Sequence, residues 1–264
     1  MFKPEMFFDL SDWEHRDLFE SVDQVWEALP IIKTYLRAKQ QVDLADYFPG
    51  EHFLTRLTVI YQGERLEDHL ALTPGEATKG HYRVSYKNQE LEGAIVFYGG
   101  VTLSGKEISI GEGSVVESGA FIQGPVLIGR QTEIRQGAYL RGGCLVGDRC
   151  VVGHTTEMKN SIMMSGAKAG HFAYIGDSIL GRECNLGAGT KLANLKLVRT
   201  TIRIKGDAGI IDTGLRKFGA ILGDGTETGC NCVTSPGTLL GPKSLVTPNT
   251  TVKAGYFPRQ SVIR

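Results

Sequence analysis

Hydrophobic residues recur at every sixth position over much of the chain. Stepping by six from residue 110 reaches ten successive aliphatic or methionine residues: Ile110, Val116, Ile122, Ile128, Ile134, Leu140, Val146, Val152, Met158 and Met164. Two later series keep the period: Leu180, Leu186, Leu192, and then Leu222, Thr228, Thr234, Leu240, Val246, Val252. This period predicts a mainly β protein, a parallel β-helix built from hexapeptide repeats. Each hexad supplies one short strand and one turn, and three hexads make a triangular coil whose periodic residues point inward.

The position four residues after each periodic residue is compact, as expected if it also faces the crowded interior. These positions hold Ser114, Ala120, Val126, Thr132, Ala138, Cys144, Cys150, Thr156, Thr226, Cys232, Thr238, Ser244 and Thr250. Four of the five cysteines, Cys144, Cys150, Cys184 and Cys232, occupy this position, so we interpret them as buried apolar residues. Cys230 is expected to point outward. Its pairing with Cys232 lacks a second such pair or a nearby histidine, so no zinc site is predicted.

The first 95 residues have a different composition. They hold five of the 34 glycines, whereas residues 96–264 hold 29. We therefore expect a small N-terminal α/β cap domain over residues 1–95 and a β-helix domain over 96–264. Residues 11–40 are expected to be helical, with Ser11 and Glu14 as a capping box and Pro30 as a break. Short strands are expected at 57–61, 81–86 and 94–98.

Two interruptions break the period. The interval from Met164 to Leu180 is 16 residues instead of 18, so two residues are missing from the register. The interval from Leu192 to Leu222 is 30 residues, and its middle, about 195–219, contains no clean hexads. That segment has six basic and two acidic residues, and we expect a loop insertion that leaves the wall of the helix. Loops on a rigid scaffold are common sites of function.

Polar residues that are candidates for a functional site surround these interruptions. Arg141 and Lys159 are 18 residues apart, one full coil, so they are expected to stack on one face. The hexads that start at Leu140, Met158 and Leu192 should share that face, and Ile175 should join them after the slip. His171 and Asn185 should lie at the adjoining edge. Histidine titrates near neutrality, as a general base requires, and arginine with lysine suits a phosphate.

Residues 140–194 closely resemble the C-terminal acetyltransferase domain of bifunctional N-acetylglucosamine-1-phosphate uridyltransferase/glucosamine-1-phosphate acetyltransferase. The segment IDTGLRKFGAILGD, after residue 194, is more similar to the archaeal sugar-1-phosphate nucleotidyltransferase/acetyltransferases. The resemblance implies a left-handed coil, acetyl-CoA as the acetyl donor, and a homotrimer with sites between subunits. It assigns the following roles: His171 as general base, Asn194 near the amine and thioester, Arg141 and Lys159 on the sugar phosphate, and Tyr174 and Asn185 on the amino sugar.

Residue chemistry and the resemblance together indicate candidate residues for the cofactor. The accessible backbone of Gly187 and Ala188 lies close to the expected site in sequence, and neutral N–H donors suit a tetrahedral intermediate. Cys230 falls where the family often carries a serine near the thioester. The basic residues of the insertion, Lys217 among them, are candidates for the phosphates of CoA or of the sugar, with a solvated loop face as the alternative. His154 is expected to point outward in a structural role. The implied activity is N-acetylation of an amino-sugar 1-phosphate or a related sugar nucleotide, with no metal required.

The chain departs from the family in two respects. The bacterial enzymes continue from the second asparagine as N-Y-D-G, whereas this chain has Asn194-Leu195-Lys196-Leu197. The nucleotidyltransferase signature, G-x-G-T-R with a companion P-K, is absent from the sequence, so uridyl transfer is not predicted. The residues leave open which hexosamine is accepted and whether its phosphate is free or nucleotide-linked.

Composition and charge narrow the remaining classes. Lys and Arg total 29, as do Asp and Glu, so global charge does not favour a nucleic-acid binder. No apolar run reaches the length of a membrane span, and the scattered cysteines favour a reduced, cytoplasmic protein. A non-catalytic, sugar-phosphate-binding trimeric scaffold or regulator remains an alternative, as does a purely structural trimer. A metalloenzyme like the γ-class carbonic anhydrases needs three histidines, and the repeat region has only His154 and His171.

Overall fold

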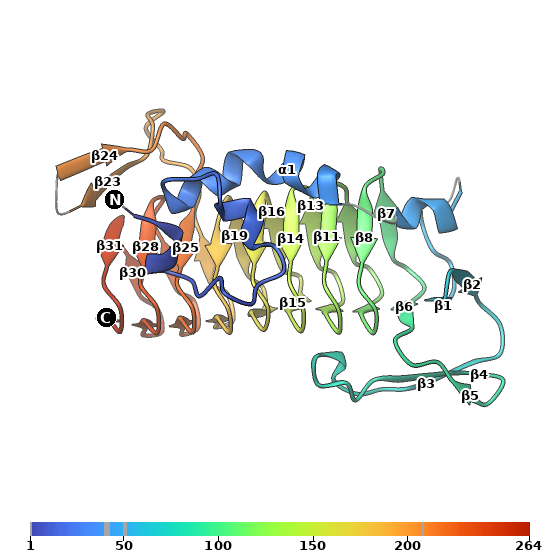
Figure 1. Ribbon diagram of the computed structural model, residues 1–264. Helices are drawn as coiled ribbons and strands as arrows, with labels where there is room; N and C mark the ends of the chain where they lie inside the picture. Colours follow the sequence, from blue (N-terminus) through green and yellow to red (C-terminus); the bar gives the residue numbers. More distant parts are fainter. Residues whose placement is uncertain (1, 40–42, 50–51, 207–208) are drawn as a thin grey trace.

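A computed structural model describes residues 2–39, 43–49, 52–206 and 209–264. The chain forms a parallel β-helix of stacked coils with N-terminal segments along its side and at one end (Figure 1). Strands one coil apart pair in parallel, and every third strand of the coils joins the same sheet when the two strands of the insertion are left out of the count. Three long sheets therefore make the three faces of the helix, which confirms the predicted β-helix.

The first sheet is here called the open face. Its strands are β7 (Thr102–Ser104), β10 (Phe121–Gln123), β13 (Tyr139–Arg141), β16 (Glu157–Lys159), β19 (Tyr174–Gly176), β22 (Lys191–Leu192), β27 (Val233–Thr234) and β30 (Thr251–Val252). The second sheet is called the covered face. Its strands are β8 (Ile108–Ile110), β11 (Val126–Ile128), β14 (Cys144–Val146), β17 (Ser161–Met163), β20 (Ile179–Leu180), β25 (Ala220–Leu222), β28 (Thr238–Leu240) and β31 (Gly255–Phe257).

The third face is longer because N-terminal strands extend it. Its coil strands are β9 (Val115–Val116), β12 (Glu133–Ile134), β15 (Val151–His154), β18 (Lys168–His171), β21 (Asn185–Leu186), β26 (Glu227–Thr228), β29 (Leu245–Val246) and β32 (Val262–Ile263). β6 (Ile95–Phe97) pairs with β9, and β1 (Thr58–Tyr61) and β2 (Glu64–Leu66) continue the sheet antiparallel. A separate arm consists of β3 (Leu70–Thr73), β4 (Arg83–Tyr86) and β5 (Gln89–Glu90). The predicted strands near 57–61, 81–86 and 94–98 are confirmed.

The inward positions of the coils form one continuous core from Ile108 to Val252, apolar except for the buried Thr228 and Thr234. The compact positions are buried as predicted, including Cys144, Cys150, Cys184 and Cys232, whereas Cys230 is exposed. These five cysteines are free thiols.

One inward assignment is wrong. Val146 pairs with Met163, not with Met164, so Met163 points into the coil. Met164 instead joins the apolar cluster outside the covered face. The two missing residues are lost at two separate corners, because inward residues are five apart from Met158 to Met163 and again from Ile175 to Leu180.

Residues 2–39 lie along the covered face instead of forming one long helix. They contain η1 (Pro4–Met6), η2 (Arg16–Phe19), η3 (Val25–Glu27) and α1 (Ala28–Lys39), and η4 (Leu44–Tyr47) and η5 (Ala77–Lys79) follow. The predicted helix over 11–40 is therefore wrong before residue 25. Pro30 lies in the first turn of α1. A backbone N–H there has no acceptor within the helix, so proline, which lacks the N–H, is tolerated. Apolar side chains of this segment pack against Leu145, Ile162 and Ile179 of the covered face.

The insertion at 195–219 leaves the wall as predicted. It contains the antiparallel strands β23 (Arg203–Gly206) and β24 (Gly209–Asp212), which project from the C-terminal half of the helix (Figure 1). Ile202 and Ile204 are buried against the body, whereas Leu197 and Val198 are exposed.

Candidate functional site

The open face brings three of the predicted residues together on successive coils. Leu140 pairs with Met158, Met158 with Ile175, and Ile175 with Leu192, as the sequence predicted. The outward neighbours of these inward residues therefore form columns. Arg141 and Lys159 each follow the inward residue of their coil, and Tyr174 precedes the inward residue of the next.

Arg141 and Lys159 already contact a carboxylate each. Arg141 Nη1 donates to Glu157 Oε1 at 2.6 Å, and this hydrogen bond raises the pKa of the guanidinium above its ordinary value. Lys159 Nζ lies 3.5 Å from Asp177 Oδ2. An incoming phosphate would therefore meet two cations held in position by partners with which it must compete.

Tyr174 and Asn194 form a polar pair at the end of the face where the insertion begins. The Tyr174 hydroxyl donates to Asn194 Oδ1 at 3.4 Å. Burial raises the pKa of Tyr174, and the negative charges of Glu157 and Asp177 raise it further. The phenol therefore stays a neutral hydrogen-bond donor through the physiological range.

His171 lies at the other edge of the open face, where β18 of the third face turns into β19. His154, one coil earlier, is its register partner. The ring of Phe172, which is 54% exposed, lies 5.3 Å from the His154 ring and 6.1 Å from the His171 ring. His154 Nδ1 is 3.0 Å from the carbonyl oxygen of Gln136, so that nitrogen carries the proton. In the described part of the chain, the His171 ring has no hydrogen-bond partner.

Ala188 and Cys230, two of the residues predicted to bind the cofactor, lie at the same corner of the β-helix as His171. The Gly189 N–H donates to the His171 carbonyl at 3.0 Å, and the Asn231 N–H donates to the Ala188 carbonyl at 2.8 Å. His171, Ala188 and Cys230 thus follow one another on consecutive coils. The Gly187 N–H donates to the Thr228 carbonyl at 2.8 Å, whereas the Ala188 N–H has no partner among the described residues. Of these two backbone N–H groups, that of Ala188 is therefore the one available to a ligand.

Two other predicted residues lie apart from His171. Asn185 pairs with Lys168, three residues before His171 along the strand, which is about 10 Å at 3.3 Å per residue. Lys217 bridges to Leu195 beside Asn194, at the opposite edge of the open face from Cys230. The site thus has a base edge, with His171, Ala188 and Cys230, and a sugar edge, with Lys159, Tyr174 and Asn194.

Sequence reasoning missed the two carboxylates of the sugar edge, Glu157 and Asp177. Glu157 could have been found, because it occupies an outward position two residues before Lys159. Asp177 could have been suspected because it lies between Ile175 and Leu180, two inward residues that are five positions apart instead of six. It is 5% exposed and accepts a hydrogen bond from Asn194 Nδ2 at 2.5 Å.

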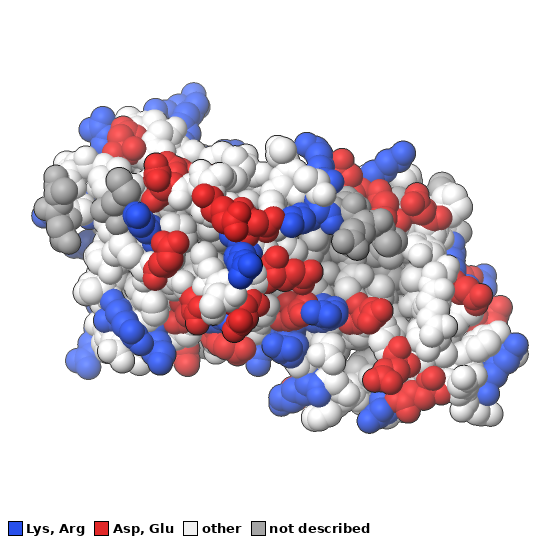
Figure 2. Space-filling view, viewed as in Figure 1, with Lys and Arg blue, Asp and Glu red and all other residues white. Residues whose placement is uncertain are grey.

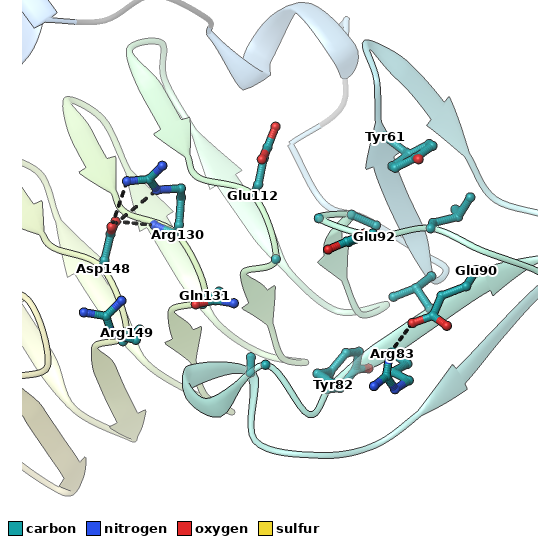
Figure 3. Close-up of a pocket in the computed structure, with 17 residues that line it drawn as sticks. Tyr61, Tyr82, Arg83, Glu90, Glu92, Glu112, Arg130, Gln131, Asp148 and Arg149 are labelled. Carbon is teal, nitrogen blue, oxygen red and sulfur yellow. Dashed lines mark hydrogen bonds and ion pairs between the residues drawn. The ribbon is translucent and has the colours of Figure 1, made fainter.

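A cavity of about 1040 Å³ lies away from these residues, between the arm and the turns that join the covered face to the third face. Figure 3 shows its paired charges, Arg130 with Asp148 and Arg83 with Glu90, together with Arg149. Acidic and basic side chains alternate over the face seen in Figure 2, without a large area of one sign. The described residues contain no group of three or more potential metal ligands. None of the described helices has the length and apolar character needed to span a membrane.

Comparison with known proteins places the similarity on the same coils. Residues 122–232 match the family model described as the GMPPB C-terminal domain. A "Bifunctional sugar-1-phosphate nucleotidylyltransferase/acetyltransferase" of Sulfurisphaera tokodaii is 36% identical over 100 residues, 37% of this chain and 25% of that protein. The "Bifunctional protein GlmU" of Methanococcus vannielii is 40% identical over 93 residues, 34% of this chain and 22% of that protein. The chain therefore spans about a quarter of the length of these relatives.

A third relative is similar over a larger share of its length. The "Putative uncharacterized acetyltransferase YaiX" of Escherichia coli K12 is 34% identical over 163 residues, 60% of this chain and 71% of that protein.

Proposed function

We propose that this chain, which belongs to the same family of acetyltransferases as YaiX, N-acetylates an amino-sugar phosphate with acetyl-CoA. The acceptor we favour is an amino-sugar 1-phosphate, glucosamine-1-phosphate or a close relative, or a nucleotide sugar. Nucleotidyl transfer is not part of the proposal.

One observation carries the proposal: a histidine edge and a cationic sugar edge flank the same short face. His171 ends β18, and Lys159 and Tyr174 lie on the open-face strands β16 and β19. The face is thus bounded by a candidate base on one side and by phosphate and amide ligands on the other. Such an arrangement holds an acceptor amine and an acyl donor side by side, which lowers the entropic cost of their reaction.

The residues divide the reaction between them. Arg141 and Lys159 hold the phosphate, and Tyr174, Asn185 and Asn194 orient the sugar and its amine. His171 accepts the proton of the amine as the nitrogen forms its bond to the thioester carbonyl carbon. The Ala188 N–H is available to the oxyanion, with Gly187 shaping the same turn and Cys230 one coil further on. The carbon–sulfur bond then breaks, and the proton returns from His171 to the leaving thiolate. Lys217 is proposed to bind a phosphate of CoA.

We further propose that the active species is a homotrimer in the cytoplasm. Arg141, Asn185 and His171 are exposed on a single chain, which is consistent with a site completed by a neighbouring copy. The N-terminal segment already occupies the covered face, so a second copy would pack against the open face or the third face. The five free thiols fit a reducing compartment.

A non-catalytic sugar-phosphate-binding scaffold is the second candidate. The observation that favours it is the unsupported His171 ring, because catalytic histidines are usually oriented by a hydrogen bond to the second ring nitrogen. The scaffold predicts phosphosugar binding without turnover of acetyl-CoA.

The test is to incubate the purified protein with acetyl-CoA and a panel of glucosamine- and galactosamine-1-phosphates, and to identify products by mass spectrometry. The proposal predicts a singly acetylated product that His171→Ala reduces by about 10²-fold or more. His154→Gln is the matched control on the neighbouring coil and should keep most of the activity. Binding of phosphosugar without any acetylated product would support the scaffold, and full activity in His171→Ala would reject the assigned base.

A further inference from the structure

The corner between the open face and the covered face is shorter in two successive coils than in the coils before them. Each shortened corner contains a residue with positive φ that is not glycine: Asn160 at 45° and Asp177 at 46°. Asparagine and aspartate tolerate this left-handed conformation better than most residues. The preceding coil turns this corner with two glycines, Gly142 and Gly143. The shortening therefore stacks two polar side chains where the coil below has none.

Asp177 contacts three donor groups from two segments, the adjacent Lys159 and Asn160 and the more distant Asn194. Its Oδ1 accepts from Asn160 Nδ2 at 3.0 Å, and its Oδ2 accepts from Asn194 Nδ2 at 2.5 Å. Lys159 Nζ lies 3.5 Å from the same Oδ2. The residue is only 5% exposed, so these partners replace the water that a carboxylate would otherwise bind.

This arrangement fixes the orientation of Asn194. A carboxylate accepts but does not donate, so the amide nitrogen of Asn194 must face Asp177. The amide oxygen then faces the Tyr174 hydroxyl, 3.4 Å away. Asp177 therefore determines which atom of Asn194 each neighbour meets.

The backbone ties the same corner to both ends of the insertion. The Phe218 N–H donates to the Asn194 carbonyl at 3.0 Å, and the Gly219 N–H donates to the Asp177 carbonyl at 2.8 Å. The chain leaves the wall after Asn194 and returns at Gly219, directly beside Asp177. The carboxylate thus lies where the insertion meets the coil.

We propose that Asp177 is a positioning residue of the site, which orients Asn194 and holds Lys159 without touching the reacting atoms. This inference rests on the proposed acetyl transfer. It has a second consequence, because the negative charge of Asp177 opposes that of a substrate phosphate at Lys159. Removing the charge should strengthen phosphosugar binding while the misoriented Asn194 slows the reaction.

Asp177→Asn tests both consequences with little change in volume. We expect kcat to fall by about tenfold or more, and KM for the phosphosugar to fall by about threefold to tenfold. A loss of folded protein would lower the apparent kcat but leave KM unchanged, so the fall in KM separates positioning from a structural role. Asp212→Asn is the matched control, because Asp212 pairs with exposed Arg203 in the hairpin and should leave both constants unchanged.

Calorimetric titration with glucosamine-1-phosphate gives a readout that does not depend on acetyl transfer. Asp177→Asn should bind it about threefold to tenfold more tightly than the unmodified protein. If the unmodified protein acetylates nothing, the proposed function fails, and this titration still decides whether Asp177 opposes phosphate at Lys159. Unchanged kcat and KM in a folded Asp177→Asn protein, or unchanged affinity in the titration, would overturn the proposal.

Discussion

The open face and the covered face belong to the same coils yet present opposite chemistry. Outward residues of the covered face are apolar: Leu127, Leu145, Ile162, Ile179, Ile221 and Leu239. Outward residues of the open face are polar or aromatic: Tyr139, Arg141, Glu157, Lys159, Tyr174 and Lys191. The inward residues of both faces form one shared core. The periodic residues therefore build the coil, and the residues between them decide what each face contacts.

The N-terminal segment shields the apolar outward residues of the covered face from water. Phe7, Trp26 and Ile32 are buried against it, and apolar area removed from water contributes about 25 cal/mol per Å². Among the residues that the structure describes, no such apolar cluster packs on the open face. On the open face, Arg141 pairs with Glu157 and Lys159 with Asp177. A charged ligand can replace one partner of such a pair, so these residues are better suited to binding a ligand than to stabilising the fold.

The largest expected effect comes from removing an anchor of the covered face. Trp26 is 2% exposed and packs against Phe2 and Phe218, with ring centroids 6.0 and 5.9 Å away. Trp26→Ala should lower the free energy of unfolding by about 3–5 kcal/mol, because it deletes a fully packed aromatic side chain. Denaturant titration measures this loss. Leu197→Ala, at a wholly exposed leucine, should change it by less than about 0.5 kcal/mol. A Trp26→Ala loss below about 1 kcal/mol would mean that the segment is not part of the cooperative fold.

The next effect concerns the open face and should leave stability nearly untouched. Arg141 is exposed beside Glu157, and pairs of this kind contribute little to folding. Arg141→Ala should raise KM for the phosphosugar by about tenfold or more, since it removes a forked, charge-assisted donor. Arg141→Lys should recover only part of this loss. Arg203→Ala is the control at an exposed arginine of the hairpin. Equal KM values for the two alanine variants would show that phosphate does not bind at Arg141.

A smaller effect is expected at Tyr174. Tyr174→Phe deletes one hydroxyl hydrogen bond to Asn194, worth about 0.5–1.5 kcal/mol, so kcat/KM should fall by about threefold to tenfold. Because burial raises the pKa of Tyr174 above 10.0, deprotonation of this phenol lies above the neutral range. The pH profiles of the variant and the unmodified protein should therefore have the same shape between about pH 6 and 9. A basic limb present only in the unmodified protein would contradict this interpretation.

The sequence predicted the faces correctly and the corners poorly. Leu140, Met158, Ile175 and Leu192 share the open face, because inward burial enforces a strict period. Met164 was assigned inward because a count of residues cannot locate a shortened corner. A left-handed Asn160 or Asp177 saves one residue without any change in hydrophobic pattern. The roles of His171 and the other site residues remain predictions.

The helix predicted for the N-terminal segment was wrong for a related reason. Its apolar spacing is that of an amphipathic helix. Residues 11–24 nevertheless form turns and the short helix η2. Ser11 binds Asp9 instead of capping a helix. Packing against the apolar covered face outweighed the local helix propensity of this segment. The same limit hid Asp177, whose importance depends on contacts with Lys159 and Asn194 from other coils.

The smallest expected effect tests the base edge by chemical modification. Of the five cysteines, only Cys230 is exposed, and burial raises the pKa of Cys144, Cys150 and Cys184 to about 12. A thiol-alkylating reagent near pH 8 should therefore modify Cys230 alone in the folded protein, because the reactive thiolate is scarce at the buried sites. Peptide mass mapping identifies the modified residue, and Cys230→Ser should remain unmodified. If a cofactor runs along the corner from His171 through Ala188, acetyl-CoA should slow this alkylation by about threefold, whereas phosphosugar alone should not. An unchanged rate with saturating acetyl-CoA would move the donor away from this edge and towards Lys217, at the opposite edge of the open face.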